Sequence, residues 1–187
     1  MILDEALKWA VKLIGTKEVP PKSNRGLVID DIEKTFGYKG VAYCALFAQW
    51  CYKRACSAEG IGFPFPGTAS SQTLFKWAKS RGVAGTDFKE LKRGDIVIWQ
   101  KYKIWQGHVG IVTDVDYENG KFMTIEGNTS NSDFGSQSEG DGIYARVRYM
   151  KKMDFVVDSF WLKGFIHIDR VFPEYLDLDP KPVEIIS

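Results

Sequence analysis

The sequence predicts an α+β protein, with helices in the first half of the chain and an antiparallel sheet in the second. In the first half, apolar residues recur at the three- and four-residue spacing of helices. From Asp95 onward, short runs rich in Val, Ile and aromatic residues alternate with clusters of Gly, Asn and Asp, as in strands joined by turns. At 187 residues and 44% hydrophobic composition, the chain can bury one substantial core. We therefore expect one domain over residues 1–172 and an extended tail over residues 173–187.

Four helices are expected, because each helical pattern is bounded by glycine, proline or polar loop residues. The first, second and fourth segments carry their apolar residues mainly on one side. The third segment is apolar nearly all round, which is typical of a buried central helix, and this helix should begin near Cys44. The expected helices cover residues 2–14, 27–36, 41–55 and 70–79.

Five short strands are expected after the helices, because the spacing of apolar residues changes there from the helical to the extended pattern. Each run is four to seven residues long and is followed by turn residues. The expected strands cover residues 96–99, 108–112, 122–126, 143–149 and 164–168.

Charge and hydrophobicity exclude several classes of function. Lys and Arg number 25 against 24 Asp and Glu, so the net charge of +1 gives no basis for binding nucleic acid. No apolar run reaches the roughly 18 residues of a membrane span. The N-terminus mixes acidic and basic residues with apolar ones, whereas a secretory signal has a basic start and an uninterrupted apolar core. We expect no signal peptide and no membrane partner.

The three cysteines differ in their expected environments. They lie within thirteen positions, which suits neither a disulfide framework nor a paired zinc-binding motif. The start of a helix stabilises a thiolate through free backbone N–H groups and the helix dipole, and only Cys44 is expected there. Cys44 is therefore the candidate nucleophile. The alternative is a small buried cysteine, an interpretation that suits Cys51 and Cys56 better.

The candidate base for this thiol is His108, at the start of the apolar strand that follows Gln106 and Gly107. The chain contains one other histidine, His167. It alternates with Phe165 on a late strand, so we interpret it as a partly exposed or hydrogen-bonded strand residue. A catalytic histidine is usually oriented by a third group, which must lie on the same face of the sheet as His108.

Glu126 and Asn128 are the candidates for this third group, because the two-residue period of a strand puts both on one face. A two-residue loop centred on Asn119 and Gly120 would turn them away from His108. A three-residue loop ending in a left-handed Gly120 would bring them to its side, and the catalytic interpretation requires this second loop. In that register Asn128 is nearer to His108 than Glu126 is. The alternative is that both are surface residues near a turn.

Taken together, these residues resemble the cysteine, histidine-dependent amidohydrolase/peptidase (CHAP) family of the papain-like NlpC/P60 group. The resemblance covers roughly residues 5–168 and rests on the order and spacing of five short motifs. They are Ser23–Gly26, Tyr43–Ala45, Arg93–Val97, Gly107–Val112 and Glu126–Asn128.

The resemblance implies a papain-like fold in which the helix of the nucleophile packs on an antiparallel sheet of about five to six strands. It implies cleavage of peptidoglycan, as an N-acetylmuramoyl-L-alanine amidase or an endopeptidase. It also implies that Glu126 orients His108 with the assistance of Asn128, in contrast to the hairpin geometry above.

Three residues in or beside these motifs are expected to contact the substrate, namely Asn24, Tyr43 and Gln106. No metal ion or other cofactor is expected. Some phage relatives bind calcium through an acidic loop before the nucleophile, but the nearest acids here fall on the second helix without the spacing of a loop site. These acids are Asp30, Asp31 and Glu33. The protein is expected to act as a monomer.

Three functions are compatible with these residues. The first is a hydrolase made in the cytoplasm that reaches the wall or periplasm after lysis or export, as a phage lysis enzyme (endolysin) or an exported antibacterial effector. The second is a catalytically silent wall-binding module. The third is a thiol peptidase or acyltransferase that acts on another amide. The presence of both Cys44 and His108 argues against the silent module.

Overall fold

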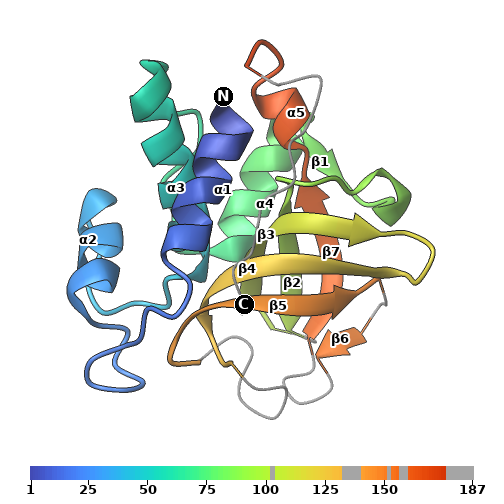
Figure 1. Cartoon of the computed structure of the whole chain (residues 1–187). Helices are drawn as coiled ribbons and strands as arrows, with labels where there is room; N and C mark the ends of the chain where they lie inside the picture. Colours follow the sequence, from blue (N-terminus) through green and yellow to red (C-terminus); the bar gives the residue numbers. More distant parts are fainter. Residues whose placement is uncertain (102–103, 132–139, 151–152, 156–159, 176–187) are drawn as a thin grey trace.

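The computed structural model describes residues 1–101, 104–131, 140–150, 153–155 and 160–175, and it confirms the expected α+β class. Four helices precede the main strands, and a short fifth helix follows the last strand (Figure 1). The helices are α1 (Ile2–Lys12), α2 (Leu27–Thr35), α3 (Cys44–Glu59), α4 (Ser71–Ser80) and α5 (Ile168–Val171). A 3₁₀ turn, η1, covers Phe88–Glu90.

The described strands form one sheet in which every neighbouring pair is antiparallel, in the order β1-β7-β2-β3-β4-β5, with β6 also paired to β7. All five expected strands are present, although the last ends at Ile166. Two further strands were not predicted, because they have only two and three residues and show no recognisable period. The strands are β1 (Ala84–Gly85), β2 (Ile96–Lys101), β3 (Gly107–Asp116), β4 (Lys121–Thr129), β5 (Gly142–Tyr149), β6 (Met153–Phe155) and β7 (Phe160–Ile166).

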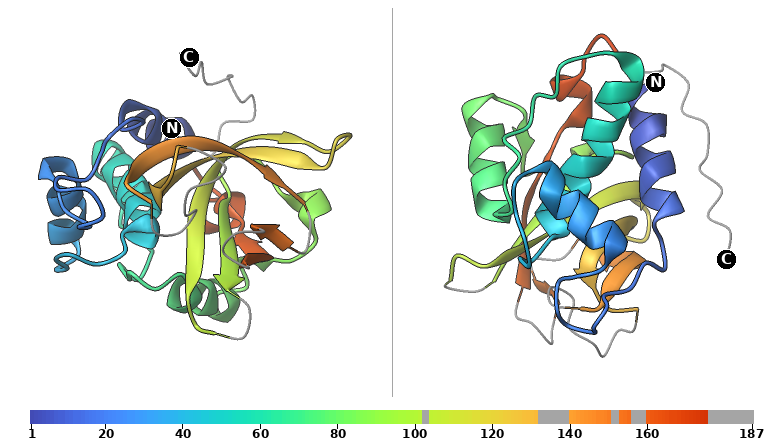
Figure 2. Two further views of the ribbon diagram at one scale, coloured as in Figure 1. Left: turned by 90° about the horizontal axis from the view of Figure 1, so that it is seen from below. Right: turned by 90° about the vertical axis from the view of Figure 1, so that its left-hand side faces the viewer.

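Strand β2 is buried on both faces of the sheet, as the alternation of its side chains shows. Ile96 and Ile98 belong to the main core, which the sheet shares with the helices. Val97 and Trp99 point to the other face, where they join a smaller cluster with Phe122. Figure 2 shows the helices gathered on one side of the curved sheet. The two cores explain why β2 reads as a continuous apolar run in the sequence.

Helix α3 is the central helix that its composition predicts. Every residue from Cys44 to Tyr52 is buried, and the helix contacts α1 as well as β3 and β4. It ends at Gly60, whose left-handed φ of 68° closes the last turn. At its start, the N-cap residue Tyr43 makes no side-chain capping hydrogen bond. The first-turn N–H groups next to Cys44 are therefore not capped by that side chain.

Helix α4 begins at a side-chain cap. The hydroxyl of Ser70 accepts a hydrogen bond from the N–H of Thr73 at 3.1 Å. The start of α4 lies near the N-terminus of α3, because Ser70, Ser71 and Cys44 border one groove. Among the described residues, none of the helices combines the length and the apolar character that a membrane crossing requires.

Candidate active site

Cys44 is the first residue of α3 and borders a surface groove. Its side chain is 3% exposed. The groove has a volume of about 510 Å³, counting the space that is open to solvent. Its other walls come from the start of α4 and from the segment that leads into β3. The lining residues include Ala42, Ser70, Ser71, Trp105, Gln106 and Gly107.

His108 lies one residue into β3, fully buried and close enough to Cys44 for the thiol to influence its titration. Burial by itself disfavours the charged imidazolium. The negative charge of Glu126 and the hydrogen bonds with Cys44 and Glu126 outweigh burial and raise the pKa of His108 to about 9. The ring is therefore expected to carry a positive charge at neutral pH.

Glu126 on β4 makes the contact at the other end of the histidine ring. Its Oε2 atom lies 2.8 Å from Nε2 of His108, and both side chains are fully buried. Burial alone would raise the pKa of the carboxyl group, but the charges of Arg148 and His108 hold it well below its ordinary range. Glu126 is thus an ionised carboxylate that can orient the ring and stabilise its charge.

Arg148 on β5 completes this buried chain of charges, and the sequence analysis did not identify it. Its Nε donates to Oε1 of Glu126 at 2.7 Å, and its Nη2 donates to Oε2. Thr124 donates its hydroxyl to the same Oε1 at 2.6 Å. The guanidinium also lies 5.8 Å from the ring centre of Trp99. Glu126 therefore lies between two cationic side chains.

The strand register puts Arg148 on the same face of the sheet as Glu126. Arg148 is opposite Phe122 in the pairing of β4 with β5, and Glu126 is opposite Tyr144. Phe122 and Glu126 lie on the same face, because four residues separate them along β4. The sequence signal for Arg148 was a basic residue at an alternate position of an apolar strand. This signal points to Glu126 only when the pairing of β4 with β5 is known.

The hairpin between β3 and β4 differs from both loops considered in the sequence analysis. Asp116 pairs with Lys121, so the turn has four residues, and the expected three-residue loop is wrong. The side chain of Asp116 favours the longer turn, because it accepts hydrogen bonds from the backbone and side-chain N–H groups of Asn119 at 3.0 and 2.8 Å. Gly120 has the left-handed φ of 60° that the sequence suggested.

A β-bulge in β3 brings Glu126 to the same face of the sheet as His108. The four-residue turn alone would put Glu126 on the face opposite to His108. The register shifts between Val112 and Asp114, where one extra residue is inserted, and Val112 pairs with Thr124. Continuing this register puts Glu126 across from Gly110, on the face of His108. A Cβ atom at Gly110 would lie 2.9 Å from Cγ of Glu126, so the glycine leaves space for the carboxylate.

Asn128 lies near the same chain of residues but has a different environment. It is 1% exposed and has a left-handed φ of 55°, where the pairing of β4 with β5 is interrupted. Its backbone carbonyl accepts a hydrogen bond from Gly140 at 3.0 Å, and its backbone lies near the hydroxyl of Tyr43. The contact with Nε2 of His108 belongs to Glu126.

The residues expected to bind substrate lie in three different environments. Gln106 lines the groove beside Cys44. Tyr43 is fully buried, so a direct contact with substrate is not available to its side chain. Asn24 does not line the groove, and its backbone N–H donates to the buried carboxylate of Glu18 at 2.9 Å. The exposed groove residue that the sequence analysis did not identify is Trp105, which is 75% exposed.

Two of the acids considered for calcium have structural partners. Asp30 forms a two-pronged ion pair with Arg25 at 2.7 and 2.9 Å. The carboxylate of Glu33 accepts the N–H groups of Gly40 and Val41, each at 2.7 Å, and so orders the loop before α3. The absence of a metal ion at this place stays a prediction.

Replacing Arg148 with methionine should destabilise the fold by about 3–5 kcal/mol, because the carboxylate of Glu126 would stay buried without its main counter-charge. Chemical denaturation gives the free energy of unfolding. The control is Arg81→Met, an exposed arginine for which a change below about 1 kcal/mol is expected. Equal effects of the two substitutions would contradict a structural role for the Arg148–Glu126 pair.

A protein family model matches the chain. The family model described as the CHAP domain matches residues 34–128, which is just over half of the 187 residues. The matched segment contains α3, β2, β3 and most of β4, and with them Cys44, His108 and Glu126. The search of curated proteins found no significant match.

Proposed function

This chain belongs to the CHAP family, and from this membership we propose that it hydrolyses an amide bond of peptidoglycan with Cys44 as the nucleophile. CHAP domains are hydrolases of the amidase or peptidase type that act on peptidoglycan. The finer proposal is a thiol mechanism, directed at either the N-acetylmuramoyl-L-alanine bond or a bond within the peptide.

One observation carries the mechanism. Cys44 stands at the start of a helix, borders a groove and lies beside a histidine whose pKa is raised to about 9. Glu126 holds that histidine from the far side of the ring. A nucleophile, a base and an orienting carboxylate in this order are the arrangement required for covalent catalysis by a thiol.

The proposed reaction has two stages. The Cys44 thiolate attacks the carbonyl carbon of the amide, and the uncapped N–H groups at the start of α3 can stabilise the oxyanion that forms. The C–N bond then breaks, and the His108 imidazolium gives its proton to the departing amine. This leaves a thioester on Cys44 and a neutral ring. His108 next takes one proton from water as the water attacks the thioester, and the thiolate leaves. The product is released as a carboxylic acid, which gives its proton to the solvent.

The groove offers both apolar and polar contacts to such a substrate. The exposed ring of Trp105 is a flat surface on which a sugar or an apolar peptide side chain can pack. Gln106 and Ser70 add groups that can donate and accept hydrogen bonds. A polymer that carries both sugars and short peptides suits this mixture.

Mass spectrometry of purified peptidoglycan after digestion tests the proposal. We expect stem peptides freed from the glycan if the protein is an amidase, and shortened or uncross-linked peptides if it is an endopeptidase. The Cys44→Ala protein at the same concentration is the control for contaminating hydrolases. Binding to the wall without any new product would support the silent wall-binding module. Cleavage of protein substrates alone would support the other thiol enzymes.

The biological setting is also a proposal. We propose that the protein is made in the cytoplasm and meets peptidoglycan after cell lysis or export, as a phage lysis enzyme or an antibacterial effector. Fractionation of producing cells tests this, because the proposal expects the protein in the cytoplasm until lysis or export begins. Early accumulation at the wall of intact producing cells would contradict it.

A further inference from the structure

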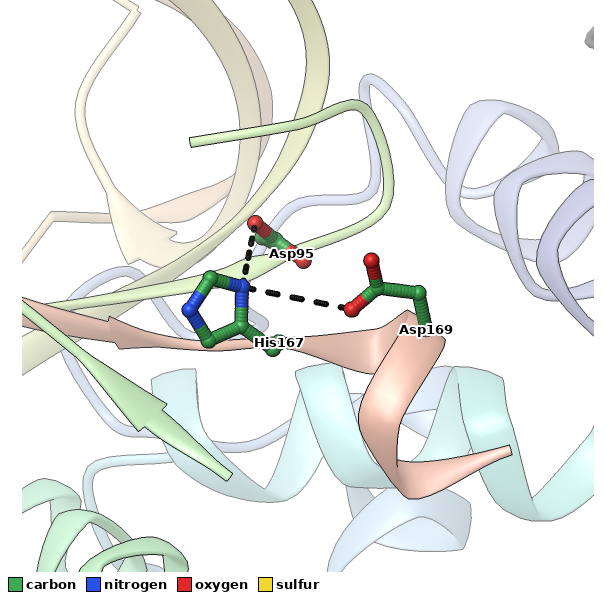
Figure 3. A group of neighbouring side chains, drawn as sticks. All are labelled: Asp95, His167 and Asp169. Carbon is green, nitrogen blue, oxygen red and sulfur yellow. Dashed lines mark ion pairs between the residues drawn. The ribbon is translucent and has the colours of Figure 1, made fainter. Parts of the chain in front are cut away.

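A second group of polar side chains lies outside the groove, at the start of β2 and the end of β7. Asp95 immediately precedes β2, His167 follows β7 as the N-cap of α5, and Asp169 is in the first turn of α5. Figure 3 shows the imidazole ring pointing between the two carboxylates. None of the three residues lines the groove beside Cys44.

His167 differs from the strand residue expected from the sequence. It lies beyond the end of β7, and it is only 1% exposed, so the expectation of a partly exposed strand residue is wrong. Its backbone N–H donates to the carbonyl of Val83 at 2.9 Å. Among the described residues, neither ring nitrogen has a hydrogen-bond partner. Its Nδ1 lies 4.0 Å from Asp95 and 3.9 Å from Asp169, which is too far for a hydrogen bond. A buried imidazole in this state requires an explanation.

The two carboxylates that face Nδ1 are held in place by other contacts. Asp95 is 2% exposed, and it accepts the backbone N–H groups of Lys92 and Ile168 at 2.9 and 3.0 Å. Asp169 accepts the ammonium group of Lys92 on Oδ2 at 2.7 Å. Its other oxygen, Oδ1, is buried and has no hydrogen-bond partner among the described residues. One nitrogen and two oxygen atoms therefore converge on a common point.

The spacing of these atoms suits an ion between them better than direct bonds. The three donor atoms lie within 4.8 Å of one another. Two ligands that each lie about 2.0–2.2 Å from one ion are at most about 4.4 Å apart. The two distances from Nδ1, 4.0 and 3.9 Å, fall below that limit, and side-chain rotations that bring the three donor atoms closer together would complete the site.

Glu90 supplies the contact that usually fixes a metal-binding histidine. Its Oε2 lies 3.4 Å from Nε2 of His167, on the side of the ring away from the two aspartates. A carboxylate that attracts the proton to Nε2 leaves the lone pair of Nδ1 directed at Asp95 and Asp169. The side chain of Asp169 is 30% exposed, so the site lies close to the surface.

We propose that His167 Nδ1, Asp95 and Asp169 bind one divalent ion of the first transition row, with water completing the coordination. The imidazole nitrogen favours such an ion over Mg²⁺ or Ca²⁺, which prefer oxygen ligands alone. The ion joins the loop before β2 to the start of α5, so its role is to hold these two segments together rather than to take part in catalysis.

Titration of the full chain with MnCl₂, followed by the electron paramagnetic resonance signal of free Mn²⁺, tests the proposal. We expect one Mn²⁺ per chain. Asp169→Asn should weaken binding at least about tenfold, because it replaces a charged ligand with a neutral one. The matched control is Asp31→Asn, an exposed aspartate on α2, which should leave the affinity unchanged. Equal affinity in the two variants, or no stoichiometric binding in the native chain, would overturn the proposal.

A second measurement needs no variant and identifies the nitrogen ligand. The chain has two histidines, so Mn²⁺ at low occupancy should broaden the NMR signals of His167 and spare those of His108. Equal broadening of both rings would overturn the site. Mg²⁺ at the same concentration should not displace Mn²⁺, and full displacement would exclude His167 as a ligand. Mn²⁺ should also raise the melting temperature of the native chain, but not that of Asp169→Asn.

Discussion

Replacing Cys44 with alanine should lower the rate of peptidoglycan cleavage by at least about 10⁴-fold, because losing the nucleophile removes the covalent route entirely. The substitution should leave the fold intact. Cys44 is at the edge of the core, and an alanine at the first position of a helix costs little. The loss should therefore appear in the catalytic rate and not in the melting temperature.

The other two cysteines are internal controls for this experiment. Cys51 is fully buried in the middle of α3, where burial raises the pKa of its thiol far above the ordinary value. Burial also raises the pKa of Cys56 to about 11. Neither residue borders the groove described beside Cys44. Cys51→Ala and Cys56→Ser should keep most of the activity.

Release of dye from labelled cell walls measures these rates, and circular dichroism checks the fold of each variant. Substantial activity in a folded Cys44→Ala protein would end the thiol mechanism. A comparable loss in the Cys51→Ala protein would mean that the rate depends on the packing of α3 and not on one thiol.

The helices and main strands were predictable because their signals are local. The spacing of apolar residues marks α1 to α4 to within a few residues, and the change to the extended pattern after Asp95 marks the sheet. The short strands β1 and β6 lack such a signal. They are recognised as strands only through their pairing with β7.

The residues of the candidate site were predictable where their local sequence indicates their position in a helix or strand. Cys44 could be selected by its position at a helix start, and His108 by its position at a strand start. Glu126 lies on the face of His108 because of a bulge at Thr113, and no turn motif in the sequence predicts this bulge. Arg148 and the environment of His167 depend on packing between segments distant in sequence. Neither could be derived from the spacing of residues along the chain.

The last prediction distinguishes Glu126 from Asn128 through the charge of His108. Below about pH 9 the ring is protonated, because the charge of Glu126 and the hydrogen bonds of the ring offset the cost of burial. Glu126→Gln keeps the shape of the side chain but removes its charge. Burial, which disfavours the charged ring, should then be the main influence on His108, and the pKa of His108 should fall. The decline in activity that follows deprotonation of the ring should move to lower pH.

The same substitution should reduce the rate roughly 10²-fold at neutral pH, because it lowers the fraction of protonated His108 that can donate to the leaving amine. The sign of the effect on stability follows from the direction of the pKa shift. The pKa of His108 is raised above its ordinary value of 6.5, so its protonation stabilises the native state fully below about pH 6.5. That contribution is lost as the pH rises through about 9, and it should be largely missing in Glu126→Gln.

The matched variant is Asn128→Gly, because glycine accepts the left-handed φ of 55° at this position without strain. Asn128 carries no charge, so its removal should leave the pKa of His108 nearly unchanged while lowering the rate by a smaller factor. NMR titration of the His108 ring in both variants gives the answer. Glu126 makes the contact at Nε2, and Arg148 keeps its carboxylate ionised, so only Glu126→Gln should move the titration. An unchanged pKa and full activity in Glu126→Gln would assign the orienting role to Asn128 instead.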